Sequence, residues 1–252
     1  MSSSPVPQVV RLLADPVRWR LLRQLARGDL RVRELVAATD QSQNLVSYHL
    51  RQLRDAGLVT ARRSSLDARD TYYSLDLAAC SRALASAASD LHAALSAPVG
   101  PEASNGPLAP SRRVLFVCTG NSSRSPMAEA LLRHRADPWV QAASAGIRPK
   151  PLHPTAVAVM RDRYRVDISS HRPTHVEAIA DQRFDYVISL CDKAREALPD
   201  FGGQSARVHW SLPDPAAGDG GPRYTTFEQI AAEIDTRVRF LLPVLARSAS
   251  PG

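Results

Sequence analysis

Residues 114–130 read VLFVCTGNSSRSPMAEA and contain the most specific pattern of the chain. Its opening run, VLFV, is rich in β-branched and aromatic residues, which predicts a buried strand ending at Cys118. Gly120 and Asn121 tolerate unusual backbone angles, so that successive N–H groups of the loop can converge on one point. The following residues favour a helix that begins near Ser123 and turns its positive end toward the same point. The stretch therefore predicts a strand, an anion-binding loop and a helix in succession.

Five residues separate Cys118 from Arg124, as expected of a loop that holds a tetrahedral oxyanion against a thiolate. The planar guanidinium of Arg124 can bind two anion oxygens at once. A lone cysteine at a strand end is otherwise a small buried hydrophobic residue, but here the flanking strand and helix favour a thiolate nucleophile at neutral pH. The expected oxyanion-binding residues are Thr119, Gly120, Asn121, Ser122, Ser123 and Ser125.

This motif resembles that of the low-molecular-weight protein tyrosine phosphatase superfamily, which includes the thioredoxin-type arsenate reductases, over about residues 112–247. The resemblance implies that Cys118 attacks an oxyanion held by Arg124. It also implies that Asn121 fixes the loop through side-chain hydrogen bonds and that Ser125 donates to the thiolate.

Strands alternate with helices beyond the loop, which predicts an α/β three-layer domain with a four-stranded parallel sheet. We expect strands at 139–144, 184–191 and 206–212, a turn at 145–146, and helices at 154–164 and 225–245. Ligands of such sheets bind at the carboxyl ends of the strands, so Cys191 and Asp214 are expected to converge on Cys118. In the resembled family the Asp-Pro loop supplies the general acid, which assigns that role to Asp214.

Two reactions follow from the resemblance, phosphotyrosine hydrolysis and arsenate reduction. Phosphatases of this kind usually place aromatic residues after the Asp-Pro, whereas Ala216 and Ala217 stand here, which favours the reductase. Cys191 is placed to resolve an arsenic adduct on Cys118 by forming a disulfide; a buried cysteine without that role is the alternative. Thioredoxin-coupled reductases carry a third cysteine where Leu198 stands. The first chemical step needs no cofactor, but recycling would need an external thiol or a redoxin as electron donor.

Composition places the chain among proteins with packed cores. It has 252 residues, 44% of them hydrophobic, a net charge of +7 and three cysteines, too few and too scattered for a disulfide framework. No apolar run approaches the ~20 residues that cross a bilayer, and the first residues do not resemble a signal peptide, so we expect a cytoplasmic protein. A segment rich in Pro, Gly and Ser predicts a division into a first domain at 1–98, a linker at 99–111 and a second domain at 112–252.

The first domain is predicted to be a winged helix-turn-helix of the α+β class. Helical periodicity covers 7–13, 16–26, 31–38, 42–56 and 77–95, and two short strands fall between 58 and 76. The segments LADPVRWRLLRQL and VRELVAATDQSQNLVSYHLRQLRDAGLV resemble the ArsR family of dimeric repressors over about residues 5–95. The resemblance implies a homodimer that binds a double-stranded DNA operator through two half-sites.

The helix at 42–56, capped by Asp40 or Ser42, would enter the major groove. The expected DNA contacts are Gln43, Asn44, Ser47, Tyr48 and Arg51 on this helix, with Arg62, Arg63 and Arg69 on the hairpin neutralising phosphates. His49 either contacts a base or, as is more usual, orients the face of the helix that contacts DNA. Arg51 and Arg54 could instead be ordinary solvated charges.

One departure from the ArsR pattern concerns its inducer site. Metalloid-sensing members often carry Cys-x-Cys before the recognition helix, but Val36 and Ala38 occupy those positions here. Cys80 is a lone thiol, which favours a core or dimer-interface role over a metal site, and we expect no bound metal.

We therefore expect a DNA-binding regulator fused to an enzyme that uses a thiolate to attack an oxyanion. The leading hypothesis is an arsenate reductase in arsenic resistance. A low-molecular-weight phosphatase that hydrolyses phosphoesters is the first alternative. A non-catalytic sensor of oxyanions or redox state that controls DNA binding is the second.

Overall fold

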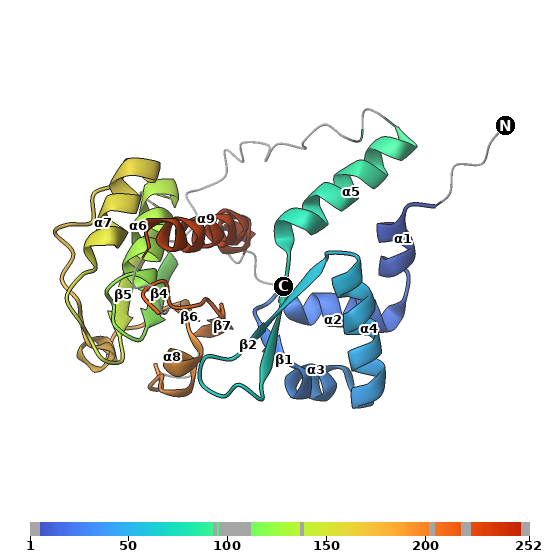
Figure 1. Cartoon of the computed structure of the whole chain (residues 1–252), viewed down its shortest axis with the longest axis horizontal. Helices are drawn as coiled ribbons and strands as arrows, with labels where there is room; N and C mark the ends of the chain where they lie inside the picture. The colour runs from blue at the N-terminus through green and yellow to red at the C-terminus, as the bar shows by residue number, and fades with distance from the viewer. Residues whose placement is uncertain are drawn as a thin grey trace. The chain divides into compact units, whose positions relative to one another are not determined.

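The computed structural model describes residues 6–92, 95, 112–136, 139–201, 205–217 and 223–247. Two compact units, Met1–Gly106 and Pro107–Gly252, divide the chain (Figure 1). The predicted linker, 99–111, lies outside the described residues. No helix in the described part of the chain is long and apolar enough to cross a lipid bilayer.

The first unit has the predicted layout of helices followed by a hairpin. Its helices are α1 (Gln8–Leu13), α2 (Pro16–Leu25), α3 (Val32–Thr39), α4 (Gln43–Asp55) and α5 (Leu77–Leu91). Its antiparallel sheet has the order β1-β3-β2, with β1 at Leu30–Arg31, β2 at Val59–Arg63 and β3 at Thr71–Leu75. Fully buried leucines of α2, α3 and α4, among them Leu21, Leu35 and Leu53, form its core. The α+β winged helix-turn-helix is confirmed; the two-residue β1 is too short to show in a sequence pattern.

Local capping explains where these helices begin. Asp15 accepts hydrogen bonds from the backbone N–H groups of Val17 and Arg18, both at 2.9 Å, and Pro16 opens α2. Of the two caps expected for α4, Ser42 accepts from the N–H of Leu45 at 3.4 Å. Asp40, the other, instead ends α3 in a left-handed conformation with φ 51°.

The second unit contains a four-stranded parallel sheet in the order β5-β4-β6-β7, as predicted (Figure 1). The strands are β4 (Arg112–Cys118), β5 (Val140–Gly146), β6 (Tyr186–Ser189) and β7 (Ala206–His209). The helices are α6 (Arg124–Ala136), α7 (Pro154–Val159), α8 (Asp192–Glu196) and α9 (Tyr224–Arg247). The middle of β4 is wholly buried, and α6 packs on β4 and β5 and against α9.

Three details of the second unit differ from the sequence predictions. Residues 145–146, predicted as a turn, end β5 and pair with the end of β4. Small residues are found here because the backbone of the loop at Asn121 approaches the strand closely. The predicted helix at 154–164 is divided into α7 and a π-helical turn, Met160–Tyr164. The strand predicted at 184–191 ends at Ser189, and the short α8, which no periodicity marked, begins just after Cys191.

Candidate functional site

Cys118 ends β4, and α6 begins at Arg124, so the five intervening residues form a loop at the carboxyl end of the sheet. Only 1% of Cys118 is exposed. Its Sγ receives the backbone N–H of Asn121 at 3.2 Å and lies 3.0 Å from Ser125 Oγ. The sulfur therefore accepts one backbone N–H and contacts the hydroxyl of Ser125.

The loop is held by a neighbouring segment that follows β5. Backbone carbonyls of the loop accept hydrogen bonds of 2.8 to 3.2 Å, in the pairs Ile147 to Cys118, Arg148 to Thr119, Lys150 to Gly120 and His153 to Ser122. Because the C=O and N–H of one planar trans peptide point in opposite directions, the N–H groups that follow these carbonyls face the other side, toward the loop's interior. Such a ring of N–H groups is an anion-binding nest.

Asn121 fixes the shape of this loop. Its φ of 46° lies in the left-handed region, which asparagine adopts more readily than most residues. Its side-chain NH₂ donates to Ser125 Oγ at 3.0 Å and to Ser144 Oγ at 2.8 Å, and its Oδ1 accepts from the N–H of Thr174 at 2.8 Å. A Cβ on Gly146 would lie 2.8 Å from the Asn121 nitrogen, so β5 must end in glycine for the loop to approach.

A polar cluster that the sequence did not predict continues behind Asn121. Ser144 Oγ donates to the buried carboxylate of Glu129 at 2.6 Å, and His171 Nε2 lies 3.2 Å from Asn121 Oδ1. Burial lowers the pKa of His171 despite the nearby carboxylate of Glu129. These residues come from separate elements without a shared spacing, so no sequence signal identified them.

Arg124 lies at the start of α6 with 4% of its surface exposed. Its Nη1 donates to the Leu212 carbonyl at 3.0 Å, and its Nη2 lies 3.4 Å from Asp214 Oδ2. Its buried Nε has no hydrogen-bond partner among the described residues, which leaves a fixed cationic donor for an anion. The Asp214 side chain is 47% exposed, so it lies at the solvent side of this guanidinium.

Cys191 is the residue directly before α8. It is 2% exposed, and its Sγ lies 3.3 Å from the hydroxyl of Thr119, the residue that follows Cys118. The structure thus brings a second thiol to the loop between Cys118 and Arg124. Leu198, where a third cysteine was considered, packs against the hydrophobic core.

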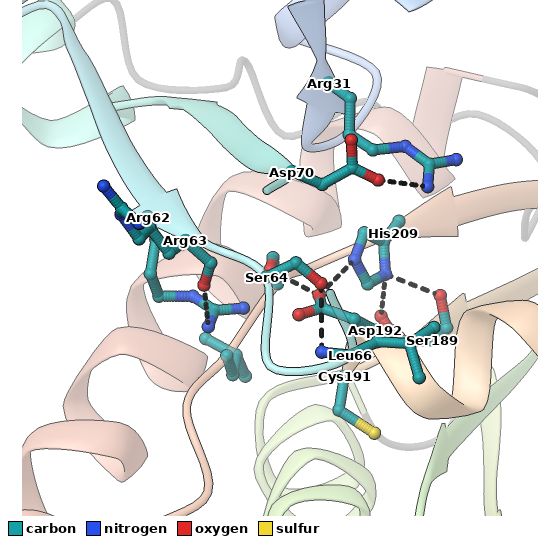
Figure 2. A network of polar contacts seen from close by, with 12 residues as sticks. Arg31, Arg62, Arg63, Ser64, Leu66, Asp70, Ser189, Cys191, Asp192 and His209 are labelled. Carbon is teal, nitrogen blue, oxygen red and sulfur yellow. Dashed lines mark hydrogen bonds and ion pairs between the residues drawn. The ribbon is translucent and has the colours of Figure 1, made fainter. Parts of the chain in front are cut away.

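Four buried polar residues, which the sequence did not single out, surround the start of α8. The Asp192 carboxylate accepts from Ser211 Oγ at 2.6 Å and lies 3.1 Å from His209 Nε2. His209 Nδ1 lies 2.8 Å from Ser189 Oγ, so that the imidazole bridges Ser189 and Asp192 (Figure 2). The ends of β6 and β7 and the residue after Cys191 are thereby joined.

In the first unit, the side chains expected to contact DNA lie on the surface. All five candidates on α4 are exposed: Gln43, Asn44, Ser47, Tyr48 and Arg51. On β2, Arg63 is exposed and Arg62 is half-buried, while Arg69 is exposed in the turn between β2 and β3. His49 is 6% exposed, which places it beneath the exposed face. In the same unit, Arg31 of β1 forms an ion pair of 3.1 Å with Asp70 (Figure 2).

The two positions where other ArsR-like sequences carry Cys-x-Cys lie on α3, and the lone thiol lies on α5. Val36 is half-buried and Ala38 is exposed on α3. Cys80 of α5 packs against the core, and burial raises the pKa of its thiol to about 11. Within the described ranges, no three side chains of His, Cys, Asp or Glu are grouped to hold a metal ion.

Comparisons with known proteins agree with this division. Residues 113–250 match the family model for low molecular weight phosphotyrosine protein phosphatase, and residues 15–61 match that for bacterial regulatory protein, arsR family. An arsenate reductase of Halalkalibacterium halodurans is 33% identical over 50% of this chain and 91% of its own length. One of Bacillus licheniformis is 34% identical over 51% of this chain and 93% of its own. A solved structure of an arsenate reductase in the oxidized state is 30% identical, covers 53% of this chain and 98% of its own, and has a TM-score of 0.48.

The Cys-x5-Arg loop, the parallel sheet and the two family models lead to one assignment. The chain belongs to the low molecular weight phosphotyrosine protein phosphatase family through an enzyme domain at residues 113–250, preceded by an ArsR-family helix-turn-helix at residues 15–61.

Proposed function

We propose that this chain is a DNA-binding regulator whose second unit reduces arsenate to arsenite. The observation that carries the proposal is the second thiol: Cys191 Sγ lies 3.3 Å from Thr119 Oγ1, next to the nucleophile Cys118 in a loop that fits a tetrahedral oxyanion. Hydrolysis of a phosphoester does not need this thiol, whereas reduction does. The arsenate reductases that are 33–34% identical to the second unit support the same choice.

In the first step, the loop N–H groups and Arg124 hold arsenate while the Cys118 thiolate bonds to arsenic. A hydroxyl group of arsenate leaves as water after taking a proton from Asp214, which acts as general acid. The product is a covalent thioester-like adduct in which arsenic is still pentavalent. No cofactor takes part in this step.

In the second step, the Cys191 thiolate attacks Cys118 Sγ. A disulfide forms, the electron pair of the S–As bond stays on arsenic, and arsenite leaves. Two electrons pass from the two thiols to arsenic, so the step balances without an outside oxidant. Because Leu198 replaces a third cysteine, an external thiol or a redoxin must reduce the Cys118–Cys191 disulfide after each turnover.

Arsenite production from arsenate, with glutathione or a redoxin as reductant, tests the proposal. We expect turnover by the full chain and its loss in both Cys118→Ser and Cys191→Ser. Turnover that survives either substitution would overturn the two-thiol mechanism.

Phosphoester hydrolysis is the second candidate, because the family model that matches residues 113–250 is that of low molecular weight phosphotyrosine protein phosphatase. Asp214, 3.4 Å from Arg124, would then protonate the leaving oxygen of the phosphoester. This function predicts hydrolysis of 4-nitrophenyl phosphate without reductant and with little effect of Cys191→Ser. Absence of both activities would favour a unit that senses oxyanions or thiol oxidation and controls DNA binding.

The first unit is proposed to bind an operator as a homodimer through the exposed face of α4, with phosphate contacts from the hairpin. Fluorescence anisotropy with the DNA upstream of the gene tests this. Binding that depends steeply on salt but not on sequence would contradict an operator-specific regulator.

A further inference from the structure

The buried network at the start of α8 has no task in the two chemical steps above. Asp192 is wholly buried, and its partners His209 and Ser211 are 6% and 4% exposed. A buried carboxylate is costly unless it is hydrogen-bonded, so each of its contacts constrains the backbone that carries it. Asp192 is also the residue directly after Cys191.

The contacts of Asp192 join two loops of the site. Its Oδ1 accepts from Ser211 Oγ at 2.6 Å and lies 3.1 Å from His209 Nε2, both at or just beyond the end of β7. Ser189, at the end of β6, closes the network through His209 Nδ1 at 2.8 Å (Figure 2). Leu212, next to Ser211, holds Arg124 through its carbonyl. The segment that carries the second thiol is therefore tied to the loop that supports the anion-binding arginine.

We propose that Asp192 is a positioning residue that holds Cys191 at the oxyanion-binding loop, with His209 and Ser211 as its anchors. The inference deepens the proposed function, on which it rests. Cys191 has only a five-residue helix after it, and such a short element does not fix a thiol by itself. The Asp192 carboxylate, at the first position of that helix, anchors the start of the helix to His209 and Ser211. This anchoring raises the effective concentration of the Cys191 thiol at Cys118.

The test measures disulfide formation without arsenate. The full chain is equilibrated in glutathione buffers, alkylated, and analysed by mass spectrometry for the Cys118–Cys191 disulfide. Two protein thiols are oxidised while one glutathione disulfide is reduced to two thiols, so the equilibrium constant reports the effective concentration of the pair. We expect Asp192→Ala to lower this constant at least about tenfold.

Two variants separate positioning from general destabilisation. Asp192→Asn keeps an Oδ1 acceptor for His209 and Ser211 and should stay within about threefold of the wild type. Asp185→Ala is the matched control, because Asp185 accepts from the backbone N–H of Arg113 at 2.7 Å, at the opposite end of the same sheet. It should lower thermal stability but leave the disulfide constant within about twofold.

If Asp192→Ala does not fold, Ser211→Ala removes one anchor and should lower the constant about two- to fivefold. An unchanged or raised constant in the folded variants overturns the proposal, as does a wild-type chain in which the disulfide never forms. The arsenite assay is separate: a chain that makes this Asp192-dependent disulfide but no arsenite would overturn the proposed reductase and leave the positioning role in place.

Discussion

The side chains proposed to contact DNA and those proposed to hold an oxyanion lie in opposite surroundings. On α4, Tyr48 is 54% exposed, and its hydroxyl accepts from Gln52, which in turn accepts from Arg18 at 2.6 Å. In the loop after β4, Cys118 and Arg124 are 1% and 4% exposed. The first surface is an exposed helix face, whereas the second is an interior site whose polar groups need partners within the fold.

Burial determines how far the effect of a substitution should extend beyond the substituted residue. An exposed side chain on a rigid helix acts mostly through its own contact, so its removal costs that contact and little else. A buried polar group is bonded to others, and its removal leaves them unsatisfied as well. We therefore expect graded, local losses on α4 and large, coupled losses in the loop.

The largest effect is expected for Arg124→Lys. Lysine keeps the charge but loses the planar fork that contacts Leu212 and Asp214 and offers Nε to an anion. Turnover of arsenate, or of an aryl phosphate, should fall on the order of 100- to 1000-fold. Arg161→Lys changes an exposed arginine of the same unit and should alter turnover less than twofold. A loss below tenfold for Arg124→Lys would show that charge alone suffices.

Asn121→Ala should come next, because it removes several buried hydrogen bonds and places alanine at φ 46°. We expect the free energy of unfolding to fall by about 2–3 kcal/mol in urea titrations. Asn121→Gly loses the same hydrogen bonds but accepts the left-handed backbone, and it should be about 1 kcal/mol more stable than the alanine variant. Equal stability of the two variants would show that the left-handed backbone at position 121 does not destabilise the alanine variant.

Local patterns predicted most of the elements, because amphipathic helices and apolar strands carry their period in the sequence. The Cys-x5-Arg loop was also recognisable, since its residues are contiguous. The end of β5 was not: residues 145–146 read as a turn, and only the approach of Asn121 explains why a strand ends in glycine there.

The supporting residues could not be predicted for a different reason. Glu129 meets Ser144 behind Asn121 because α6 packs on β5, and Asp192 meets His209 because the parallel sheet brings the ends of β6 and β7 together. Each residue alone is an ordinary polar side chain in its element. Such pairs depend on topology and register, which a single sequence does not contain.

On α4 we expect a smaller effect. Arg51→Ala should weaken DNA binding about three- to tenfold and lower the slope of log affinity against log salt by about one, because one phosphate contact is lost. Anisotropy titrations at several salt concentrations measure both. Arg23→Ala removes an exposed arginine at the end of α2 and is the matched control. An equal loss in the control would mean that net charge, and not the face of α4, sets affinity.

The smallest effect is expected at Asp15, which caps α2. Burial opposes its charge, yet the N–H groups of Arg18 and Val17 and the Arg18 guanidinium hold the pKa of this carboxyl below its usual value of 3.8. A carboxyl whose folded pKa is lowered stabilises the protein above the unfolded pKa, and this contribution is lost as pH falls through the folded value.

At pH 7, Asp15→Ala should therefore lower the free energy of unfolding by about 1 kcal/mol, measured by urea titration of the far-ultraviolet circular dichroism. The difference from the wild type should shrink as the pH falls below about 4. Asp15→Asn caps helices without a charge, so it should lose less stability than alanine at pH 7, and the difference between these two variants should not change with pH. If the difference in unfolding free energy between the wild type and Asp15→Ala stays constant down to pH 3, the charge of Asp15 does not contribute to the cap.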